Sequence, residues 1–111
     1  MAKPPAPKID PTARADLRRI GRETVNRWGE AQKERYLAKI TARIKTLAFQ
    51  PNIGTARDDL DRGVRSAVAG KHLLLYRIID DRVHILRVVH QNRDLKREIE
   101  RGRSRDLDIG R

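Results

Sequence analysis

The chain has 111 residues and no cysteine, which excludes a disulfide scaffold and a cysteine-ligated metal site. Its 26 Lys and Arg against 15 Asp and Glu give a formal net charge of +11 and a sequence pI near 11.0, so we expect an acidic partner: nucleic acid, an acidic protein segment or a nucleoprotein. A single domain with one modest core fits this length. The sequence contains no stretch apolar enough for a membrane span or a signal peptide, so we expect a cytoplasmic protein without a membrane partner.

The first residues form a basic, proline-rich arm. We expect residues 1–9 to be mobile, with at most a stunted strand at Lys8–Ile9, because proline lacks the backbone donor that a strand ladder needs. Asp10 and Pro11 then predict the start of a helix. The Asp10 side chain can accept hydrogen bonds from unpaired helix amides, and the ring of Pro11 fixes a helical φ.

Two amphipathic helices are predicted next, over about residues 12–28 and 30–48. Apolar positions recur at helical spacing in both segments. These positions are Ala13, Leu17, Ile20, Thr24, Val25 and Trp28 in the first helix and Tyr36, Leu37, Ile40, Ile44 and Leu47 in the second. Gly29 separates the helices. The second helix is expected to end before Gln50-Pro51, because the residue before a proline avoids the helical region. The aromatic residues predicted to lie in the core are Trp28, Tyr36 and Phe49.

Three short runs rich in Val, Ile, Leu and Tyr predict an antiparallel meander. They span residues 63–69, 72–79 and 83–90, and Gly70-Lys71 and Asp80-Asp81 punctuate them. In the last two runs apolar side chains occur at odd and even positions alike, so we expect both faces of the sheet to be covered. Residues 51–62 are polar and are expected to form a connecting loop. The predicted fold class is α+β, with an N-terminal helical hairpin packed on a small antiparallel β-sheet.

A series of short motifs occurs in a fixed order along the chain. The motifs are Ala13-x-x-Asp16-Leu17-x-x-Ile20, Arg27-Trp28-Gly29-x-x-Gln32-x-x-x-Tyr36, Pro51-x-x-Gly54, Gly63-x-Arg65, His72, Tyr76-Arg77-Ile78 and Ile85-Leu86-Arg87-Val88-Val89-His90. In this order the sequence resembles the ParE toxins of the RelE/ParE superfamily, which belong to type II toxin–antitoxin systems. The resemblance implies a RelE/ParE-like toxin domain over residues 10–94. The arm precedes this domain, and a charged C-terminal helix or tail over residues 95–111 follows it.

The resemblance to ParE implies a toxin that inhibits DNA gyrase by binding, slows growth and is neutralised by a cognate antitoxin, as in plasmid stabilisation. The alternative within the superfamily is a RelE-like endoribonuclease that cleaves mRNA on the ribosome. Cleavage needs a cation beside the phosphorane and groups that move protons. Arg65, Arg87 and Arg93 could supply the cation, and Tyr76 or a histidine could act as the acid or base. RelE-like nucleases tend to carry a tyrosine near the C-terminus, and this chain has none after Tyr76, which favours the ParE branch.

A third alternative is a non-catalytic basic module that binds nucleic acid. Modules that stack bases rely on exposed aromatic side chains, and Trp28, Tyr36 and Phe49 all fit the predicted core. A basic face without such side chains gives an affinity that depends on salt and not on base sequence.

The histidines His72, His84 and His90 lie in the predicted strands without cysteine or carboxylate at ligand spacing, so we predict no metal and no cofactor. His72 follows a predicted turn and can fix the hairpin by a hydrogen bond. His90 ends a strand beside Gln91 and Arg93, where an exposed polar group more often meets a partner. Both roles, structural and partner-binding, stay open for these residues.

Two arginines interrupt the apolar strands. The guanidinium groups of Arg77 and Arg87 either pair with carboxylates or line a groove for something acidic. A two-residue turn at Asp80-Asp81 places them on opposite faces of the sheet, and a slip of one residue places them on the same face. The sequence leaves both registers open. The predicted partner-binding residues are Arg65, His72, Arg77, Arg87, His90 and Arg93.

The predicted helical hairpin can cover one face of the sheet, while the strands carry apolar side chains on both faces. We therefore predict that an acidic antitoxin segment folds onto the sheet and places carboxylates against Arg77 and Arg87. The alternatives are that residues 95–109 fold back over this face, or that two copies of the chain pair there.

Overall fold

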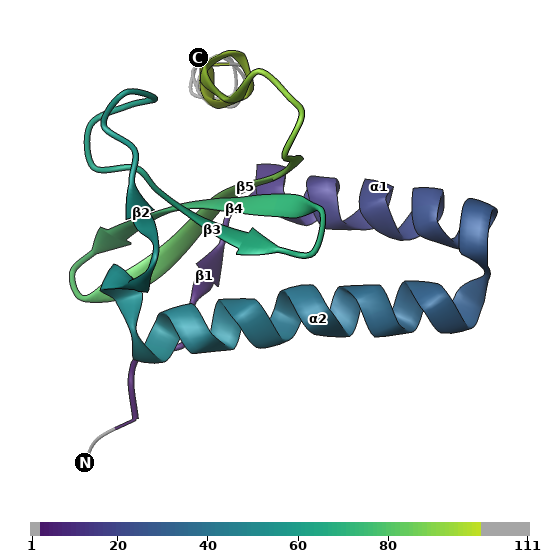
Figure 1. Cartoon of the computed structure of the whole chain (residues 1–111). Helices are drawn as coiled ribbons and strands as arrows, with labels where there is room; N and C mark the ends of the chain where they lie inside the picture. Colours follow the sequence, from purple (N-terminus) through teal and green to yellow (C-terminus); the bar gives the residue numbers. More distant parts are fainter. Residues whose placement is uncertain (1–2, 101–111) are drawn as a thin grey trace.

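The fold consists of a helical hairpin, a five-stranded mixed sheet and a short helical segment that follows the sheet (Figure 1). The computed structural model describes residues 3–100. In chain order the elements are β1 (Lys8–Ile9), α1 (Pro11–Trp28), α2 (Glu30–Phe49), the 3-10 helix η1 (Pro51–Ile53), β2 (Thr55–Ala56), β3 (Arg65–Ala69), β4 (His72–Ile79) and β5 (Arg82–His90). Residues 95–100 are helical and form the C-terminal helical segment. The predicted α+β fold class is confirmed.

The helical hairpin turns at Gly29, as predicted. The φ of Gly29 is +89°, a region that favours glycine, so α1 ends and α2 begins within one residue. Asp10 is the N-cap of α1, but its side chain makes no capping hydrogen bond, which corrects the prediction. Instead, the backbone N–H of Asp10 donates to the carbonyl of Ile85 at 3.0 Å and fixes the start of the helix to β5. Among residues 3–100, no helix combines the length and apolarity that a membrane crossing requires.

The sheet has the strand order β1-β5-β4-β3-β2. The predicted antiparallel meander is formed by β3, β4 and β5, while β1 pairs parallel with β5. Asp80 and Asp81 form the turn between β4 and β5, and both have the positive φ that a type I′ turn requires (51° and 63°). The segment 51–62, predicted as a loop, contains η1 and the two-residue strand β2, which pairs with β3. Elements this short have too few positions for a periodic pattern to reveal them.

A bulge in β5 sets the register that the sequence left open. Arg77 pairs with His84, whereas beyond the bulge Leu75 pairs with Arg87, so β5 contains one extra residue between these pairs. The extra residue shifts the alternation of β5 by one position. Arg77 and Arg87 therefore lie on the same face of the sheet, the one opposite the helical hairpin, called the far face.

The face toward the helical hairpin carries the main core. Its members come from both helices and the three long strands, and its largest fully buried side chains are Ile20, Ile40, Leu47, Leu74, Tyr76 and Ile85. Trp28 and Phe49 were predicted to lie in this core, but they are 67% and 66% exposed. α1 ends with Trp28 at the tip of the hairpin, beyond the sheet, and Phe49 is the last residue of α2 (Figure 1). Tyr36 is half-buried and packs against the core.

The far face is covered by the C-terminal helical segment and by the loop before β3. Figure 1 shows this segment on the side of the sheet opposite α2. The cluster that joins these parts consists of Val64, Leu75, Val89 and Ile99, with Leu60, Leu73, Leu86 and Leu95 around them. Around Leu75 and Val89 the far face is therefore covered by this chain itself, whereas Val68 is 52% exposed. The alternative that C-terminal residues fold back holds for residues 95–100, and residues 101–109 lie outside the described residues.

Candidate functional site

A groove of about 600 Å³ lies between α1, the adjoining ends of β4 and β5, and the C-terminal helical segment. This volume is within the range of roughly 300–1,000 Å³ that is typical of ligand sites. Basic and imidazole groups in its lining are Arg19, His72, Arg87, His90 and Arg93, and carboxylates are Asp16, Glu23 and Glu98. The structure thus brings together four of the six predicted partner-binding residues.

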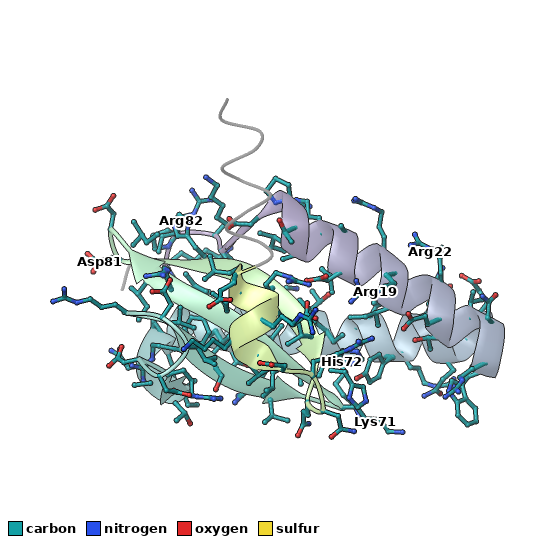
Figure 2. The ribbon with its side chains drawn as sticks, turned by 90° about the horizontal axis from the view of Figure 1, so that it is seen from above. Arg19, Arg22, Lys71, His72, Asp81 and Arg82 are labelled. Carbon is teal, nitrogen blue, oxygen red and sulfur yellow. The ribbon has the colours of Figure 1, made fainter. Side chains whose placement is uncertain are left out.

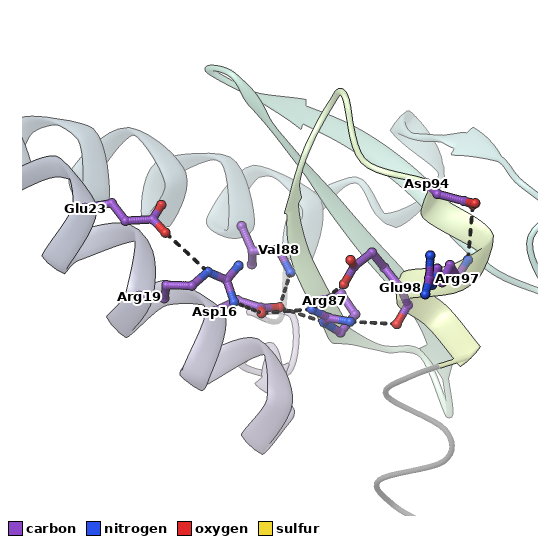
Figure 3. A network of polar contacts seen from close by, with 8 residues as sticks. All are labelled: Asp16, Arg19, Glu23, Arg87, Val88, Asp94, Arg97 and Glu98. Carbon is purple, nitrogen blue, oxygen red and sulfur yellow. Dashed lines mark hydrogen bonds and ion pairs between the residues drawn. The ribbon is translucent and has the colours of Figure 1, made fainter.

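Arg87 and Asp16 form a buried ion pair beside the groove (Figure 3). The Arg87 Nε and Nη2 donate to the Asp16 carboxylate at 2.8 and 3.0 Å. The same carboxylate accepts the backbone N–H of Val88 at 2.9 Å. β1 pairs with β5 only as far as Ile85, so the edge of β5 beyond this point lacks a neighbouring strand. Asp16 provides the acceptor that this edge needs, because an unpaired buried N–H is costly.

Arg87 also holds the C-terminal helical segment. Its Nη1 donates to the backbone carbonyl of Glu98 at 2.6 Å, and its Nη2 pairs with the Glu98 carboxylate at 3.0 Å. Burial acts against the charge of Arg87, but the hydrogen bonds and charges of Asp16 and Glu98 outweigh it and raise the pKa of the guanidinium. A single permanently charged side chain thus joins α1, β5 and the C-terminal helical segment.

Arg19 extends this network along α1. Its Nη1 lies 3.3 Å from Asp16, and its Nε lies 3.8 Å from Glu23. The Arg19 side chain is 45% exposed, and pairs of this kind contribute little to stability. Figure 2 shows Arg19 on the same side of the molecule as His72. Arg19 can therefore turn to a bound partner at little cost.

Two histidines also line the groove. The Nδ1 of His72 lies 2.6 Å from the hydroxyl of Tyr36 on α2, and this hydroxyl accepts the backbone N–H of Lys71 at 2.9 Å. The rings of His72 and His90 meet edge to face, with centroids 5.4 Å apart. Burial and, after it, the neighbouring His90 lower the pKa of His72, so its ring is neutral at pH 7. His72 thus fixes the β3–β4 turn to α2, as its position after a turn predicted.

Arg93 lies just after β5, in a turn closed by its backbone N–H and the carbonyl of His90 at 3.0 Å. Its side chain is exposed and lines the groove. Within residues 3–100, no carboxylate forms an ion pair with this guanidinium. Within the same residues, no group of His, Asp and Glu has an arrangement that could hold a metal ion. The groove therefore offers an accessible positive charge beside two imidazoles.

Arg65 and Tyr76, the other residues considered for catalysis, lie outside the groove. They pair across β3 and β4 and hold the segment around η1. The fully buried Tyr76 hydroxyl donates to the carbonyl of Pro51 at 2.6 Å and accepts the N–H of Gly54 at 3.1 Å. Arg65 donates to the carbonyls of Asn52 and Gly54 at 2.9 and 2.5 Å. The structure thus separates Arg65 and Tyr76 from the groove that contains the other two nuclease candidates.

Arg77 also lies outside the groove. Its guanidinium pairs with Asp61 at 2.8 Å and donates to the carbonyl of Arg62. It anchors the loop before β3 to the far face. Arg77 and Arg87 therefore both take the structural role that the sequence left open beside the partner-binding one.

Sequence reasoning did not select Asp16, Arg19 or Tyr36 as site residues. Asp16 did carry a signal, because it is a carboxylate between Ala13 and Leu17 on the apolar side of a helix. Such a residue needs a cationic partner, and the sequence contains too many arginines to identify it. Tyr36 was assigned to the core, and its hydroxyl partner depends on the packing of α2 against the sheet.

Comparisons with known proteins agree on one family. The model of the family described as ParE toxin of type II toxin-antitoxin system, parDE, matches residues 8–95. Toxin ParE1 of Mycobacterium tuberculosis is 37% identical over 92 residues, which cover 82% of this chain and 94% of the relative. Toxin ParE1 of Caulobacter vibrioides is 34% identical over 85 residues, which cover 77% of this chain and 88% of the relative.

The fold is also similar to a solved structure described as the chromosomal ParDE TA system from P. aeruginosa. The TM-score is 0.70, and the match covers 80% of this chain and 98% of that chain. The sequence identity is 23%, so this similarity concerns the fold.

Proposed function

Because the chain belongs to the ParE toxin family of type II toxin–antitoxin systems, we propose that it is a cytoplasmic toxin that inhibits DNA gyrase by binding and that a cognate antitoxin neutralises it. The family match over residues 8–95 includes the helical hairpin, the sheet and most of the groove lining. The observation that carries the proposal for the antitoxin is the groove itself. Accessible basic side chains line it, and the whole chain is strongly basic.

We assign the groove to an acidic segment of the antitoxin. Arg19 on the α1 side and Arg93 on the β5 side are exposed, and neither is needed to hold the sheet. Arg87, which does hold it, lies behind them. The net charge of +11 favours the approach of an acidic chain, and a segment that orders on binding can follow a long, shallow surface.

The nuclease alternative gains no support from the site. Tyr76 is fully buried with both hydrogen-bonding functions of its hydroxyl used, so it has no access to a 2′-OH. Arg65 is bonded to backbone carbonyls of the same segment. The ribosome therefore stays a second candidate on family grounds alone.

Expression of the chain without its partner tests the toxin proposal. We expect slow growth and filamentation with a DNA-damage response, and we expect the purified chain to inhibit supercoiling by gyrase. Co-expression of the antitoxin, sought as the product of the neighbouring gene, should restore growth. Arrest with cleaved messages and unaffected supercoiling would contradict the gyrase target. Normal growth together with unaffected supercoiling at large excess would contradict the toxin proposal.

A further inference from the structure

We propose that His72, His90 and Arg93 form a receptor for one carboxylate side chain of the partner that occupies the groove. The inference rests on the proposed function for the identity of this partner, which is the antitoxin. The receptor itself is built from side chains of this chain, so a simple acidic peptide can test it.

Both histidines line the groove, and the contacts of their Nδ1 atoms decide where each ring carries its N–H donor. We assign the Tyr36 hydroxyl, which accepts the backbone N–H of Lys71, as the donor to the Nδ1 of His72, and this assignment places the ring proton of His72 on Nε2. The Nδ1 of His90 accepts the backbone N–H of Asn92 at 3.2 Å, so the ring proton of His90 is also on Nε2. Within residues 3–100, no contact uses either Nε2 donor. The neighbouring elements thus fix both tautomers before a ligand arrives.

Arg93 supplies the charge that these donors lack. The turn from His90 to Arg93 brings the guanidinium into the same part of the lining as the two rings. Two N–H donors beside a guanidinium match the acceptor sites of a carboxylate, and charge-assisted hydrogen bonds of this kind are stronger than neutral ones. His72 and His90 approach each other edge to face, so a single carboxylate can be shared between them.

The groove favours a single carboxylate over a nucleic acid. Asp16, Glu23 and Glu98 also line it, and they repel a chain of phosphates, which needs several cations in a row. Among the described residues, no Phe, Tyr or Trp lines the groove, so it lacks a platform for base stacking. A peptide can place one carboxylate at the receptor and keep apolar or neutral side chains near the acidic groups.

Binding of a carboxylate should be coupled to uptake of a proton by His72. In the free chain, burial and, after it, the neighbouring His90 lower the pKa of His72, and a carboxylate at the receptor acts in the opposite direction. The added proton enters at Nδ1, where the Tyr36 hydroxyl changes from donor to acceptor. Affinity should therefore rise as pH falls from 7.5 to 6.0, because His72 binds the proton more readily in the complex.

Other groups around His72 are present in both states and do not change the sign of this coupling. The charged groups that face it are Glu23 and Asp16, which raise its pKa, and Arg19, which lowers it. The remaining groups nearby are Tyr36, Lys71, His90 and Arg93. Glutamate side chains of a ligand are ionised throughout this pH range, so they do not contribute protons.

The test is an NMR titration of the full chain with a hexaglutamate peptide, followed on the ring protons of the histidines. We expect the resonances of His72 and His90 to shift on binding. We expect those of His84 to remain in place, because His84 lies at the opposite end of β5 and pairs with Arg77. The affinity should be about threefold to tenfold higher at pH 6.0 than at pH 7.5. Equal shifts of all three histidines, or an affinity without pH dependence, would overturn the proposal.

Substitutions make the test specific. Arg93→Gln removes an exposed charge and should weaken hexaglutamate binding by about tenfold. The double substitution His72→Gln with His90→Gln should remove the pH dependence, and glutamine retains an acceptor for the Tyr36 hydroxyl. His84→Gln is the matched control and should bind as the unsubstituted chain does. If hexathymidylate binds more tightly than hexaglutamate and produces the same shifts, the receptor is for phosphate and the proposal is wrong.

The same variants separate this inference from the proposed function. If the antitoxin binds the unsubstituted chain and both groove variants equally well, the receptor is contradicted and the toxin–antitoxin proposal stands. If hexaglutamate behaves as expected but no antitoxin binds, the receptor is supported and the proposed function is contradicted.

Discussion

The two faces of the sheet are covered by different kinds of structure. Leu74 and Leu75 are neighbours on β4 and are both fully buried, but they belong to different clusters. Leu74 packs under two long helices with regular apolar stripes. Leu75 packs under helical residues 95–100 and a loop, and arginine contacts tie both of these covers to the sheet.

This difference explains why the groove lies where it does. The face toward the helical hairpin is a close-packed apolar core, whose buried side chains are not available to a partner. The cover of the far face depends on Arg87 and Arg77, whose hydrogen bonds are directional and charged. The groove lies at the junction of the two, where Arg87 is bound by Asp16 and Glu98 while Arg19 and Arg93 remain accessible.

The largest effect is expected at Asp16, which connects α1 to the edge of β5. Asp16→Ala leaves Arg87 without its main partner and the Val88 N–H without an acceptor. We expect the free energy of unfolding to fall by about 3–5 kcal/mol, measured by urea denaturation. Asp16→Asn keeps an acceptor and should lose less. A loss below about 1 kcal/mol for Asp16→Ala would mean that Glu98 alone can compensate Arg87, against this account.

The pair Leu74→Ala and Leu75→Ala compares the two faces directly. Both substitutions remove the same atoms from fully buried positions. We expect Leu74→Ala to lose about 3–4 kcal/mol and Leu75→Ala about 2 kcal/mol, because the short cover of the far face can move into the cavity. Urea denaturation under identical conditions gives both values. Equal losses would contradict the distinction between the faces.

A smaller effect is expected where the C-terminal helical segment meets the sheet. Ile99 is 7% exposed and belongs to the far-face cluster. Ile99→Ala should lower the free energy of unfolding by about 1 kcal/mol, less than a core position, because the segment is short and can rearrange. Hydrogen exchange of residues 95–100 should accelerate in this variant, with no change in α2. A loss of about 3 kcal/mol or more would place this segment in the main core.

The smallest effect is a pH dependence of stability. Burial and His90 lower the pKa of His72 in the folded chain below the ordinary value of 6.5, which applies to the unfolded chain. At pH values just below 6.5 the unfolded chain therefore binds more protons than the folded chain. The contribution of His72 is therefore complete above pH 6.5 and is lost as pH falls through 6.5 toward the folded pKa. His72→Gln should show a shallower loss of stability between pH 7 and 5 than His84→Gln. Identical slopes would contradict the assignment.

The main core could be predicted from the sequence because it depends on local periodicity. The stripes of α1 and α2 and the alternation of β4 repeat over many residues, so each position supports the others. Trp28 continues the apolar stripe of α1 and Phe49 directly follows the predicted second helix, but the periodic pattern does not say where the sheet beneath the helices ends. The prediction therefore placed both in the core, although the structure exposes them.

The far face and the groove were harder to predict because they depend on pairs distant in sequence. Asp16 and Arg87 are 71 positions apart, and many other arginines compete for the same carboxylate. The bulge at Leu86 has no local signal, since this residue resembles its apolar neighbours. The sequence did indicate which arginines and histidines lie near the end of β5. It could not distinguish those that hold loops, such as Arg65 and Arg77, from those that line the groove.

The measurement that tests the groove most directly is the affinity of the antitoxin for two charge reversals, Arg93→Glu and Arg97→Glu. Both residues are exposed and carry the same charge, but only Arg93 lines the groove among the described residues. By calorimetry at one ionic strength, we predict that Arg93→Glu weakens binding by at least about tenfold, since a charged hydrogen bond is replaced by repulsion, and that Arg97→Glu has little effect. Equal affinity for the two variants would contradict the assignment of the groove to the antitoxin.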